Sequence, residues 1–399
     1  MLTPSAEFSV SHEQASPELV PEETIRVLHI VESLDHQAVE NWLLRVFRVA
    51  SRDYPEYHWT FFCVLGKKGR LDDEARGLGA EVIHSRYEIG EKRHFLLGLR
   101  EVMKRGRYDV LHCHHDIMSA AYLAAAAGLP FRKRIVHLHN TSLDLPTPSR
   151  LKADLAREPM RQMCLRMADQ IVGISGAALD SLLAGHQRDP LRHRVVHYAV
   201  DTDRFAAARP DREGFRRPLD LDPQVKIMLF AGRLVGYKNP LFVLEILERL
   251  KAAGENVAAV FAGAGELELE IHECAKKKSL EDCVRLIGFR DDVPELMRSS
   301  DVLLWPSREH MKEGLGLGIV EAQSAGLPIV MSESVPAEAT IVPELVRVLS
   351  LSAGPEVWAR TALGLMNDPR PGFAESRARV ESSSFSMAQG VANLMALYV

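Results

Sequence analysis

The sequence is poor in cysteine and has no cysteine pair that could form a zinc site or a disulfide framework. Its five cysteines are scattered over 399 residues, and none belongs to a Cys-x-x-Cys pair. An odd number of dispersed thiols is typical of a protein kept in a reducing compartment. We therefore expect free thiols, no bound metal and a cytoplasmic location.

The sequence also lacks a long apolar run and a strong excess of either charge. No run approaches the ~18 apolar residues of a membrane span. The net charge of −5 argues against a basic nucleic-acid binder, so no nucleic-acid partner is expected. Residues 1–23 are polar, contain proline and have no apolar core. They are predicted to be a disordered tail rather than a signal peptide.

What the sequence does contain is a regular alternation of short apolar runs and amphipathic segments. The alternation begins at residue 25, pauses over the Asp-, Arg- and Pro-rich stretch 201–223, and restarts at residue 226. Alternating strands and helices predict a parallel sheet with helices on both faces. We expect two such doubly wound, Rossmann-like α/β domains facing a central cleft.

The composition shifts also predict where the domains begin and end. The predicted order is a tail (1–23), an N-terminal Rossmann-like domain (24–205), a linker (206–223), a C-terminal Rossmann-like domain (224–375) and a C-terminal helix packing back on the first domain (376–399). Ligands of such sheets bind beyond the carboxyl ends of the strands. The loops that follow strands are therefore the first places to search for a site.

The most informative loop lies between Glu313 and Glu321. Glycines at positions 314, 316 and 318 follow a buried strand and lead into a helix. The first N–H groups of a helix are unpaired and attract anions. Carboxylates cannot hold an anion there, so the two Glu residues suit the hydroxyls of ribose or of a sugar. A capped helix with two solvated Glu residues is the alternative.

A second loop carries two cations after the strand at residues 226–231. Gly232 and Arg233 are followed by Lys238 before the next helix. An Arg fork and a Lys point charge in one cleft loop are suited to a diphosphate. Two solvated basic side chains would give the same pattern.

Two further loops give weaker signals. Gly263-Ala-Gly265 follows one strand and could be a tight turn or a close backbone approach to a ligand. Phe289 and Arg290 follow Gly288 after the next strand. They could receive a planar base, although Phe289 could equally be ordinary packing.

Taken in order, these motifs resemble the retaining GT-B glycosyltransferases of family 4 (group 1). The motifs are Gly-Arg-Leu-x3-Lys-Asn, Gly-x-Gly, Gly-Phe-x-Asp-Asp and Glu-Gly-x-Gly-Leu-x3-Glu-Ala, which begin at residues 232, 263, 288 and 313. The likeness covers most of residues 25–399 and is greatest to bacterial exopolysaccharide and capsule enzymes. Each motif is weak alone, and the ordered set is specific.

The resemblance implies that residues 24–205 form the acceptor-side domain and residues 224–375 the nucleotide-sugar-binding domain. It also implies a role for each matching residue. Arg233 and Lys238 would hold the donor diphosphate and stabilise the departing nucleotide, Glu313 would contact the donor sugar, and His139 would lie near the reacting sugar. The remaining donor-binding residues implied are Gly232, Gly265, Phe289, Arg290, Gly314, Leu315, Gly316 and Glu321, with Glu321 accepting from the ribose hydroxyls.

The implied reaction is transfer of a hexose, with retention, from a UDP- or GDP-sugar to a glycan or lipid-linked acceptor in cell-surface polysaccharide biosynthesis. The resemblance implies no metal and no cofactor. The basic helix expected at residues 92–107 could contact anionic lipid at the inner face of the plasma membrane. A solvated outer helix face is the alternative.

One loop departs from the family pattern. Members carry Gly-x4-Gly-Gly-x-Glu after the first strand, whereas residues 32–40 retain Glu40 without the glycines. This leaves open a nucleotide-sugar 2-epimerase-like enzyme, or a catalytically impaired partner subunit. The run from His112 to His115 looks like a metal cluster, but alternation along a strand sends neighbours to opposite faces. Loop or cleft histidines are therefore expected there.

Overall fold

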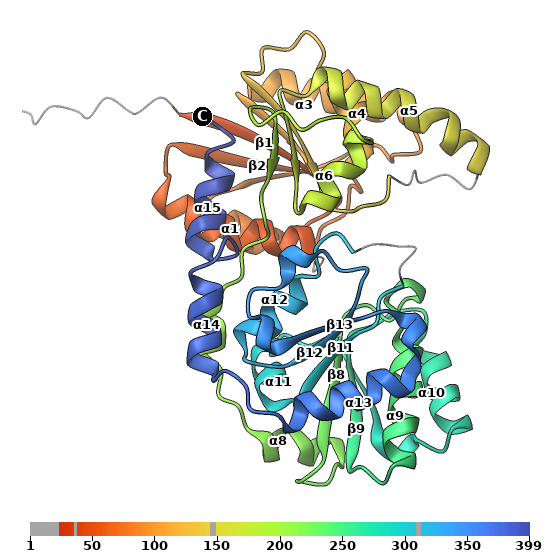
Figure 1. Ribbon diagram of the computed structural model, residues 1–399. Coiled ribbons are helices and arrows are strands. Elements are labelled where there is room, and N and C mark those ends of the chain that lie inside the picture. Colours follow the sequence, from red (N-terminus) through yellow and green to blue (C-terminus); the bar gives the residue numbers. More distant parts are fainter. Residues whose placement is uncertain (1–23, 36–37, 144–148, 309–312) are drawn as a thin grey trace, which may run out of the picture.

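The structure is a computed structural model that describes residues 24–35, 38–143, 149–308 and 313–399. Figure 1 shows two α/β domains, one above the other, each with helices on both faces of its sheet. All strand pairs are parallel. The expected pair of doubly wound sheets is therefore confirmed.

The N-terminal sheet has seven strands in the order β3-β2-β1-β4-β5-β6-β7. The strands are β1 (Ile25–Val31), β2 (Tyr57–Cys63), β3 (Glu81–His84), β4 (Val110–Cys113), β5 (Lys133–Leu138), β6 (Gln170–Gly173) and β7 (His193–Val195). The helices between them are α1 (Ala38–Asp53), α2 (Asp72–Gly77), α3 (Lys92–Gly106), α4 (Ser119–Ala125), α5 (Arg150–Met167) and α6 (Gly176–Leu183). Ser175 caps α6, because its side chain accepts from the N–H of Ala178.

The C-terminal sheet has six strands in the order β10-β9-β8-β11-β12-β13. The strands are β8 (Lys226–Ala231), β9 (Val257–Ala262), β10 (Val284–Gly288), β11 (Val302–Trp305), β12 (Ile329–Ser332) and β13 (Val346–Leu349). The covering helices are α9 (Pro240–Ala252), α10 (Glu268–Lys277), α11 (Val293–Ser299), α12 (Leu317–Ser324) and α13 (Gly354–Asn367). The central strands β9 and β11 are buried along their whole length, as continuous apolar runs require.

The chain crosses between the two sheets twice. The first crossing, in which the sequence shows no periodicity, contains the short helices α7 (Thr202–Ala207) and α8 (Arg212–Arg216). Asp side chains cap both helices, which is how segments too short for a periodic pattern become helical. The second crossing is α14 (Phe373–Glu381) followed by α15 (Met387–Met395), where one helix was expected. Helix α15 packs against α1 of the first sheet (Figure 1).

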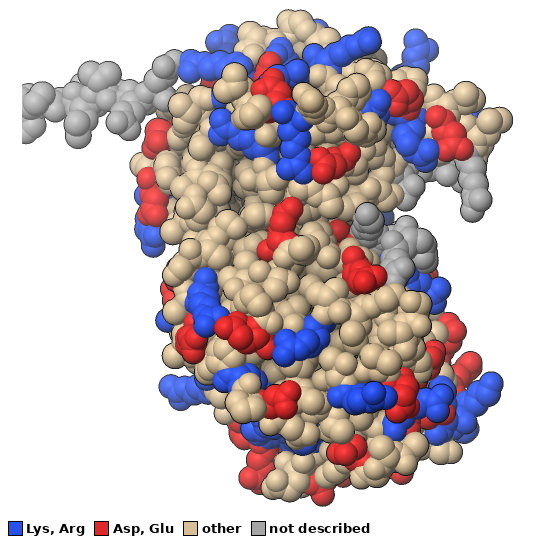
Figure 2. All heavy atoms as spheres, viewed as in Figure 1, with Lys and Arg blue, Asp and Glu red and all other residues tan. Residues whose placement is uncertain are grey.

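Charges of both signs are interspersed over the face shown in Figure 2, and the belt between its two halves is mostly uncharged. Helix α3 is amphipathic as predicted, with Phe95, Leu99 and Met103 buried. Its Arg100 is partly exposed and donates to the carbonyls of Ala125 and Ala127. Within the described residues, no helix is both long enough and apolar enough to span a bilayer.

Candidate functional site

A buried ion pair between Lys238 and Glu313 lies at the carboxyl end of the second sheet. Lys238 ends a turn of 3-10 helix after β8, and its Nζ is 2.6 Å from Oε1 of Glu313. Trp305, the last residue of β11, donates to the same oxygen at 3.1 Å, and its ring centroid lies 4.3 Å from Nζ. Ser307 donates from Oγ at 2.5 Å. Glu313 is therefore held rigidly, with 7% of its surface exposed.

Arg233 is brought close to Lys238 by a shared aromatic neighbour. Its Nη2 donates to the Tyr237 hydroxyl at 2.7 Å. The cationic groups of Arg233 and Lys238 lie 5.7 and 5.4 Å from the Tyr237 ring centroid. The two cations predicted to act together thus share one tyrosine, and the guanidinium is the more exposed of the two.

Glu321 lies on α12 and is paired across the two domains. Arg45 of α1 places Nη1 3.3 Å from Oε1 of Glu321, and both side chains are mostly buried. Sequence reasoning did not identify Arg45, because it is one of several charged residues on an amphipathic helix. The residues next to Arg45 in the sequence give no sign that it contacts the second domain, so the contact is visible only in the three-dimensional structure.

The loop between Glu313 and Glu321, which we call the glycine loop, contacts the N-terminal domain directly. A Cβ built on Gly314 would lie 2.3 Å from the carbonyl oxygen of His139, which follows β5. Ser175 donates from Oγ to the Gly314 carbonyl at 2.5 Å. Gly316 has a φ of +79° where α12 begins, a conformation that disfavours any side chain. The fully buried Leu315 side chain lies between them.

Gly263 and Gly265 are explained by contact between loops, whereas a Cβ on Gly232 would meet no atom within 4 Å. A Cβ on Gly265 would lie 2.3 Å from the Leu234 carbonyl oxygen, and a Cβ on Gly263 would lie 2.0 Å from that of Gly232. The loops after β8 and β9 are thereby pressed together at the edge of the site. Packing alone accounts for these glycines, and their contact with a ligand stays a prediction.

Phe289 and Arg290 lie on the surface after β10. Phe289 is 53% exposed, and the guanidinium of Arg290 forms two hydrogen bonds with Asp292 at 2.8 and 2.5 Å. These hydrogen bonds raise the pKa of Arg290 and lower that of Asp292. Recognition of a base by this turn stays a prediction.

His139 is buried, and both of its ring nitrogens are already engaged. Nδ1 lies 2.6 Å from the Tyr198 hydroxyl and Nε2 lies 3.1 Å from Nδ1 of His114. Burial lowers the pKa of His139 well below its usual range, so the ring is neutral. The ring therefore belongs to the interior of the first domain, while its backbone carbonyl meets the glycine loop.

The predicted separation of the histidines by alternation holds for only part of the run from His112 to His115. Alternation sends Cys113 to one face of the sheet, but His112 and His114 are two residues apart and share the other face. There they meet His29, His137 and His139, which gives two groups of three imidazoles with ring nitrogens within 4.8 Å. A third group, with its ligand atoms within the same distance of one another, comprises Cys63 of β2, Asp72 of α2 and His84 of β3.

The loop that departs from the family pattern is described only in part, because residues 36 and 37 lie outside the described residues. The Leu34 carbonyl accepts from the N–H of Leu71 at 2.9 Å, and a Cβ on Gly69 would lie 2.1 Å from the same oxygen. Glu40, retained from the pattern, is buried in α1 with no hydrogen-bond partner for Oε2 among the described residues. Burial, followed by repulsion from Glu32 and Asp35, raises the pKa of Glu40 to about 7.

This raised pKa predicts a pH-dependent stability that Glu40→Gln removes. The unfolded carboxyl ionises near its ordinary value of 4.5 and the folded one near 7. Stability is thus fully present below pH 4.5 and is lost as pH rises through 7. The loss is roughly 3 kcal/mol, since each pKa unit is worth about 1.4 kcal/mol.

Denaturant unfolding at two pH values checks this expectation. Glu40→Gln should leave stability nearly unchanged at about pH 4 and raise it at about pH 8.5 by up to roughly 3 kcal/mol. The exposed Glu270 of α10 provides the control, because Glu270→Gln should have no effect at either pH. An equal effect of Glu40→Gln at both pH values would contradict the assignment.

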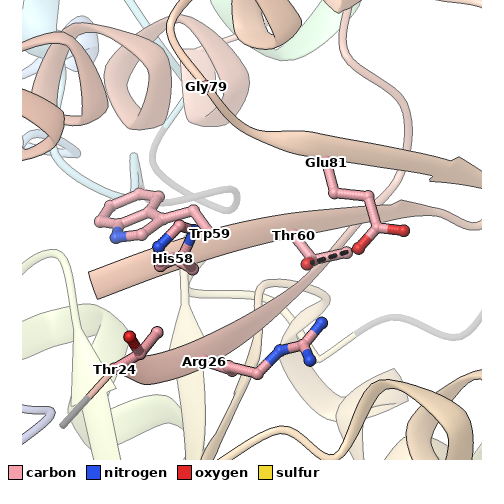
Figure 3. Close-up of a pocket in the computed structure, with 7 residues that line it drawn as sticks. All are labelled: Thr24, Arg26, His58, Trp59, Thr60, Gly79 and Glu81. Atoms are coloured by element: carbon pink, nitrogen blue, oxygen red, sulfur yellow. Dashed lines mark hydrogen bonds between the residues drawn. The ribbon is translucent and has the colours of Figure 1, made fainter. Parts of the chain in front are cut away.

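A separate hollow lies far from this site. It is lined by Thr24, Arg26, His58, Trp59, Thr60, Gly79 and Glu81. Figure 3 shows these residues around the first residues of β1, β2 and β3, with Thr60 donating to Glu81 at 3.2 Å. In a parallel sheet this is the amino edge, opposite the edge where ligands bind. The hollow is therefore separate from the candidate site.

Comparison with known proteins supports the class that this geometry suggests. The fold is GT-B, two parallel α/β domains with the loops after β5 and β11 in contact. A family model described as Glycosyltransferase Family 4 matches residues 33–204, and one described as Glycosyl transferases group 1 matches residues 211–384. Together they span both domains, and the chain is a glycosyltransferase of the GT-B type.

Individual proteins extend the comparison over nearly the whole chain. A Bacillus subtilis (strain 168) protein, EpsF, named as a glycosyltransferase, is 28% identical over 94% of this chain and 96% of its own length. An Escherichia coli UDP-Gal:alpha-D-GlcNAc-diphosphoundecaprenol alpha-1,3-galactosyltransferase is 25% identical over 66% of this chain and 67% of its own. The crystal structure of Anabaena Alr3699/HepE with UDP and glucose superposes with a TM-score of 0.74 at 17% identity, covering 93% of this chain and 98% of that one.

Proposed function

We propose that this protein transfers a hexose from a nucleotide-sugar donor to a glycan or lipid-linked acceptor, with retention and without a metal or cofactor. Its place is in cell-surface polysaccharide synthesis, in the cytoplasm or at the inner face of the membrane. The observation that carries the proposal is the convergence of Arg233, Lys238 and Glu313 at the carboxyl ends of β8 and β11. Names of the relatives support the donor and acceptor classes, since one is a UDP-galactose transferase acting on a diphosphoundecaprenol.

The chemistry follows from where charge develops. As the nucleoside diphosphate leaves, negative charge grows on its oxygens, and fixed cations stabilise it without reorganising. Lys238 and Arg233 are the cations, and the first N–H groups of α12 add to their field. Trp305 covers Lys238 from one side and reduces its contact with water, which strengthens its interaction with phosphate.

The carboxylates suit the neutral parts of the donor. Within the described residues, the donors to Glu313 all meet Oε1, so Oε2 is the oxygen proposed to accept from a sugar hydroxyl. Glu321 is held by Arg45, and the same carboxylate is proposed to accept from the ribose. The Arg45 contact fixes the orientation of Glu321 in the closed arrangement of the domains.

A donor screen tests the proposal. A UDP- or GDP-sugar at about 100 times its Kd should stabilise the protein by roughly 3 kcal/mol, seen as a rise in Tm. Glu321→Ala should remove most of that shift, because the ribose loses its acceptor. The solvent-exposed Glu270→Ala serves as the matched control and should keep the shift.

Product analysis then separates the reaction classes. A transferase releases UDP or GDP faster when an acceptor is added, and the product keeps the anomeric configuration of the donor. A 2-epimerase on the same fold would change the donor sugar with no acceptor present. Absence of any donor-induced rise in Tm would contradict the proposal and favour a non-catalytic partner subunit.

A further inference from the structure

Five histidine rings lie side by side on one face of the N-terminal sheet. They are His29 of β1, His112 of β4, His114 just after β4, His137 of β5 and His139 just after β5, and none is more than 6% exposed. Residues two apart on a strand share a face, and the register pairs His29 with His112. We call these five residues the histidine cluster.

The first part of the cluster is a continuous series of contacts from the cleft inward. The Tyr198 hydroxyl lies 2.6 Å from Nδ1 of His139. Nε2 of His139 lies 3.1 Å from Nδ1 of His114, and Nε2 of His114 lies 3.0 Å from Nδ1 of His29. Each ring therefore uses one nitrogen toward the cleft and the other toward the interior.

The second part is joined to the first by the penultimate residue of the sequence. The Tyr398 hydroxyl lies 3.5 Å from Nε2 of His29 and 3.0 Å from Nδ1 of His112. Nε2 of His112 then lies 3.1 Å from Nδ1 of His137. Seven side chains thus form one unbranched series of hydrogen bonds from Tyr198 to His137.

All five rings are neutral, which limits how protons can be arranged. Burial lowers the pKa of every one of them, to about 3 for His29 and His137 and well below the usual range for the other three. A neutral imidazole has one N–H donor and one acceptor nitrogen. If each contact is a hydrogen bond, every ring must donate in the same direction along the series.

The two possible directions are not equivalent. If Tyr198 donates to His139, every acceptor is filled and the last Nε2–H, on His137, has no hydrogen-bond acceptor among the described residues. That ring lies nearly perpendicular to the Trp42 indole, at 82° and 5.4 Å between centroids. The reverse direction leaves an unfilled lone pair on His137 and no described acceptor for the Tyr198 proton. The short O···N distance at Tyr198 also suits an O–H donor.

We propose that the histidine cluster is a one-directional hydrogen-bond chain that runs from Tyr198 to His137 and fixes the tautomer and orientation of His139 behind the glycine loop. His114, Tyr198 and Tyr398 are positioning residues in this chain. The carbonyl of His139 meets Gly314, so the chain also fixes the surface on which the glycine loop rests. Eight of the ten cluster nitrogens have a hydrogen-bonding partner within 3.1 Å, so a metal ion held by three of these rings would have to break hydrogen bonds of the chain.

Nitrogen-15 spectra of the histidine rings test the direction without any assay of activity. In full-length protein labelled at histidine, all five cluster rings should be Nε2–H tautomers, and none should titrate between pH 5.5 and 8.5. Single His→Gln variants assign the signals. An Nδ1–H tautomer, a doubly protonated ring in that range, or stoichiometric zinc, nickel or copper in the purified protein would overturn the proposal.

Tyr398→Phe tests the positioning role by removing one hydroxyl and keeping the ring. The ring signals of His29 and His112 should move, and kcat for transfer should fall on the order of tenfold while the donor KM is unchanged. Tyr57 packs 6.0 Å from Tyr398 between ring centroids but lies outside the chain, so Tyr57→Phe should change neither.

The activity readout depends on the proposed function, whereas the spectra do not. Unmoved ring signals, or an unchanged kcat, in Tyr398→Phe would overturn the positioning role. A wild-type protein without transfer activity would count against the proposed function, and the tautomers would still decide the chain.

Discussion

Lys238→Ala is expected to lower kcat/KM for sugar transfer by on the order of 10³-fold. The reason is that Lys238 is the cation fixed beside Glu313 and covered by Trp305, so its charge meets the leaving diphosphate without reorganisation. Removing one preorganised group of this kind typically costs 10²–10³-fold, about 3–4 kcal/mol. Steady-state release of UDP or GDP measures the effect.

The same substitution also leaves a buried carboxylate without its cation, so a loss of stability must be separated from a loss of chemistry. Breaking a buried ion pair costs roughly 3–5 kcal/mol, whereas replacing both charges by neutral groups is often nearly neutral. Lys238→Met combined with Glu313→Gln should therefore recover most of the Tm lost by Lys238→Met alone and stay inactive. Recovery of activity with stability would show that the lysine has only a structural role.

Much of the architecture could be predicted from local pattern alone. Strands such as Val257–Ala262 and Val302–Trp305 are continuous apolar runs, and runs of that kind belong to the middle of a doubly wound sheet. The proposed clamp could be found because Arg233 and Lys238 are five residues apart in one loop, so a single turn brings them together. In these cases the residues that act together are close in the sequence, so the sequence alone is enough to predict their arrangement.

The parts that sequence reasoning missed depend on distance in the chain. Arg45 and Glu321 are 276 positions apart, and no local feature of α1 predicts their contact. The histidine cluster joins strands separated by crossover helices, and its link at Tyr398 comes from the far end of the sequence. Only the strand order β1-β4-β5 and the return of α15 to α1 bring those rings together.

Long-range geometry also changes the meaning of a residue that was predicted. His139 is predicted to lie near the reacting sugar, and the structure adds that both of its ring nitrogens are bonded within the first domain. Gly314 was expected for its backbone N–H, yet the tightest constraint on it comes from the opposite domain. Sequence reasoning thus singled out both His139 and Gly314, and the structure shows that the two residues contact each other across the domains.

Gly314→Ala is expected to separate the two domains and to reduce transfer on the order of 10²-fold. The added methyl would lie 2.3 Å from the His139 carbonyl oxygen and 3.1 Å from Cδ1 of Ile174, and a backbone carbonyl cannot move aside as a flexible side chain can. The loop must therefore withdraw, which lengthens the Ser175–Gly314 hydrogen bond and moves the neighbouring Glu313 away from its productive position.

Scattering and kinetics together check this expectation. The variant should have a larger radius of gyration without donor, a higher donor KM and a lower kcat. Gly372→Ala, in the same half of the chain, adds its methyl where no atom lies within 4 Å, and it should match the wild type in all three measurements. Wild-type kinetics in Gly314→Ala would mean that transfer does not require this close approach of the two domains. The role left for Gly314 would then be in the loop that leads into α12.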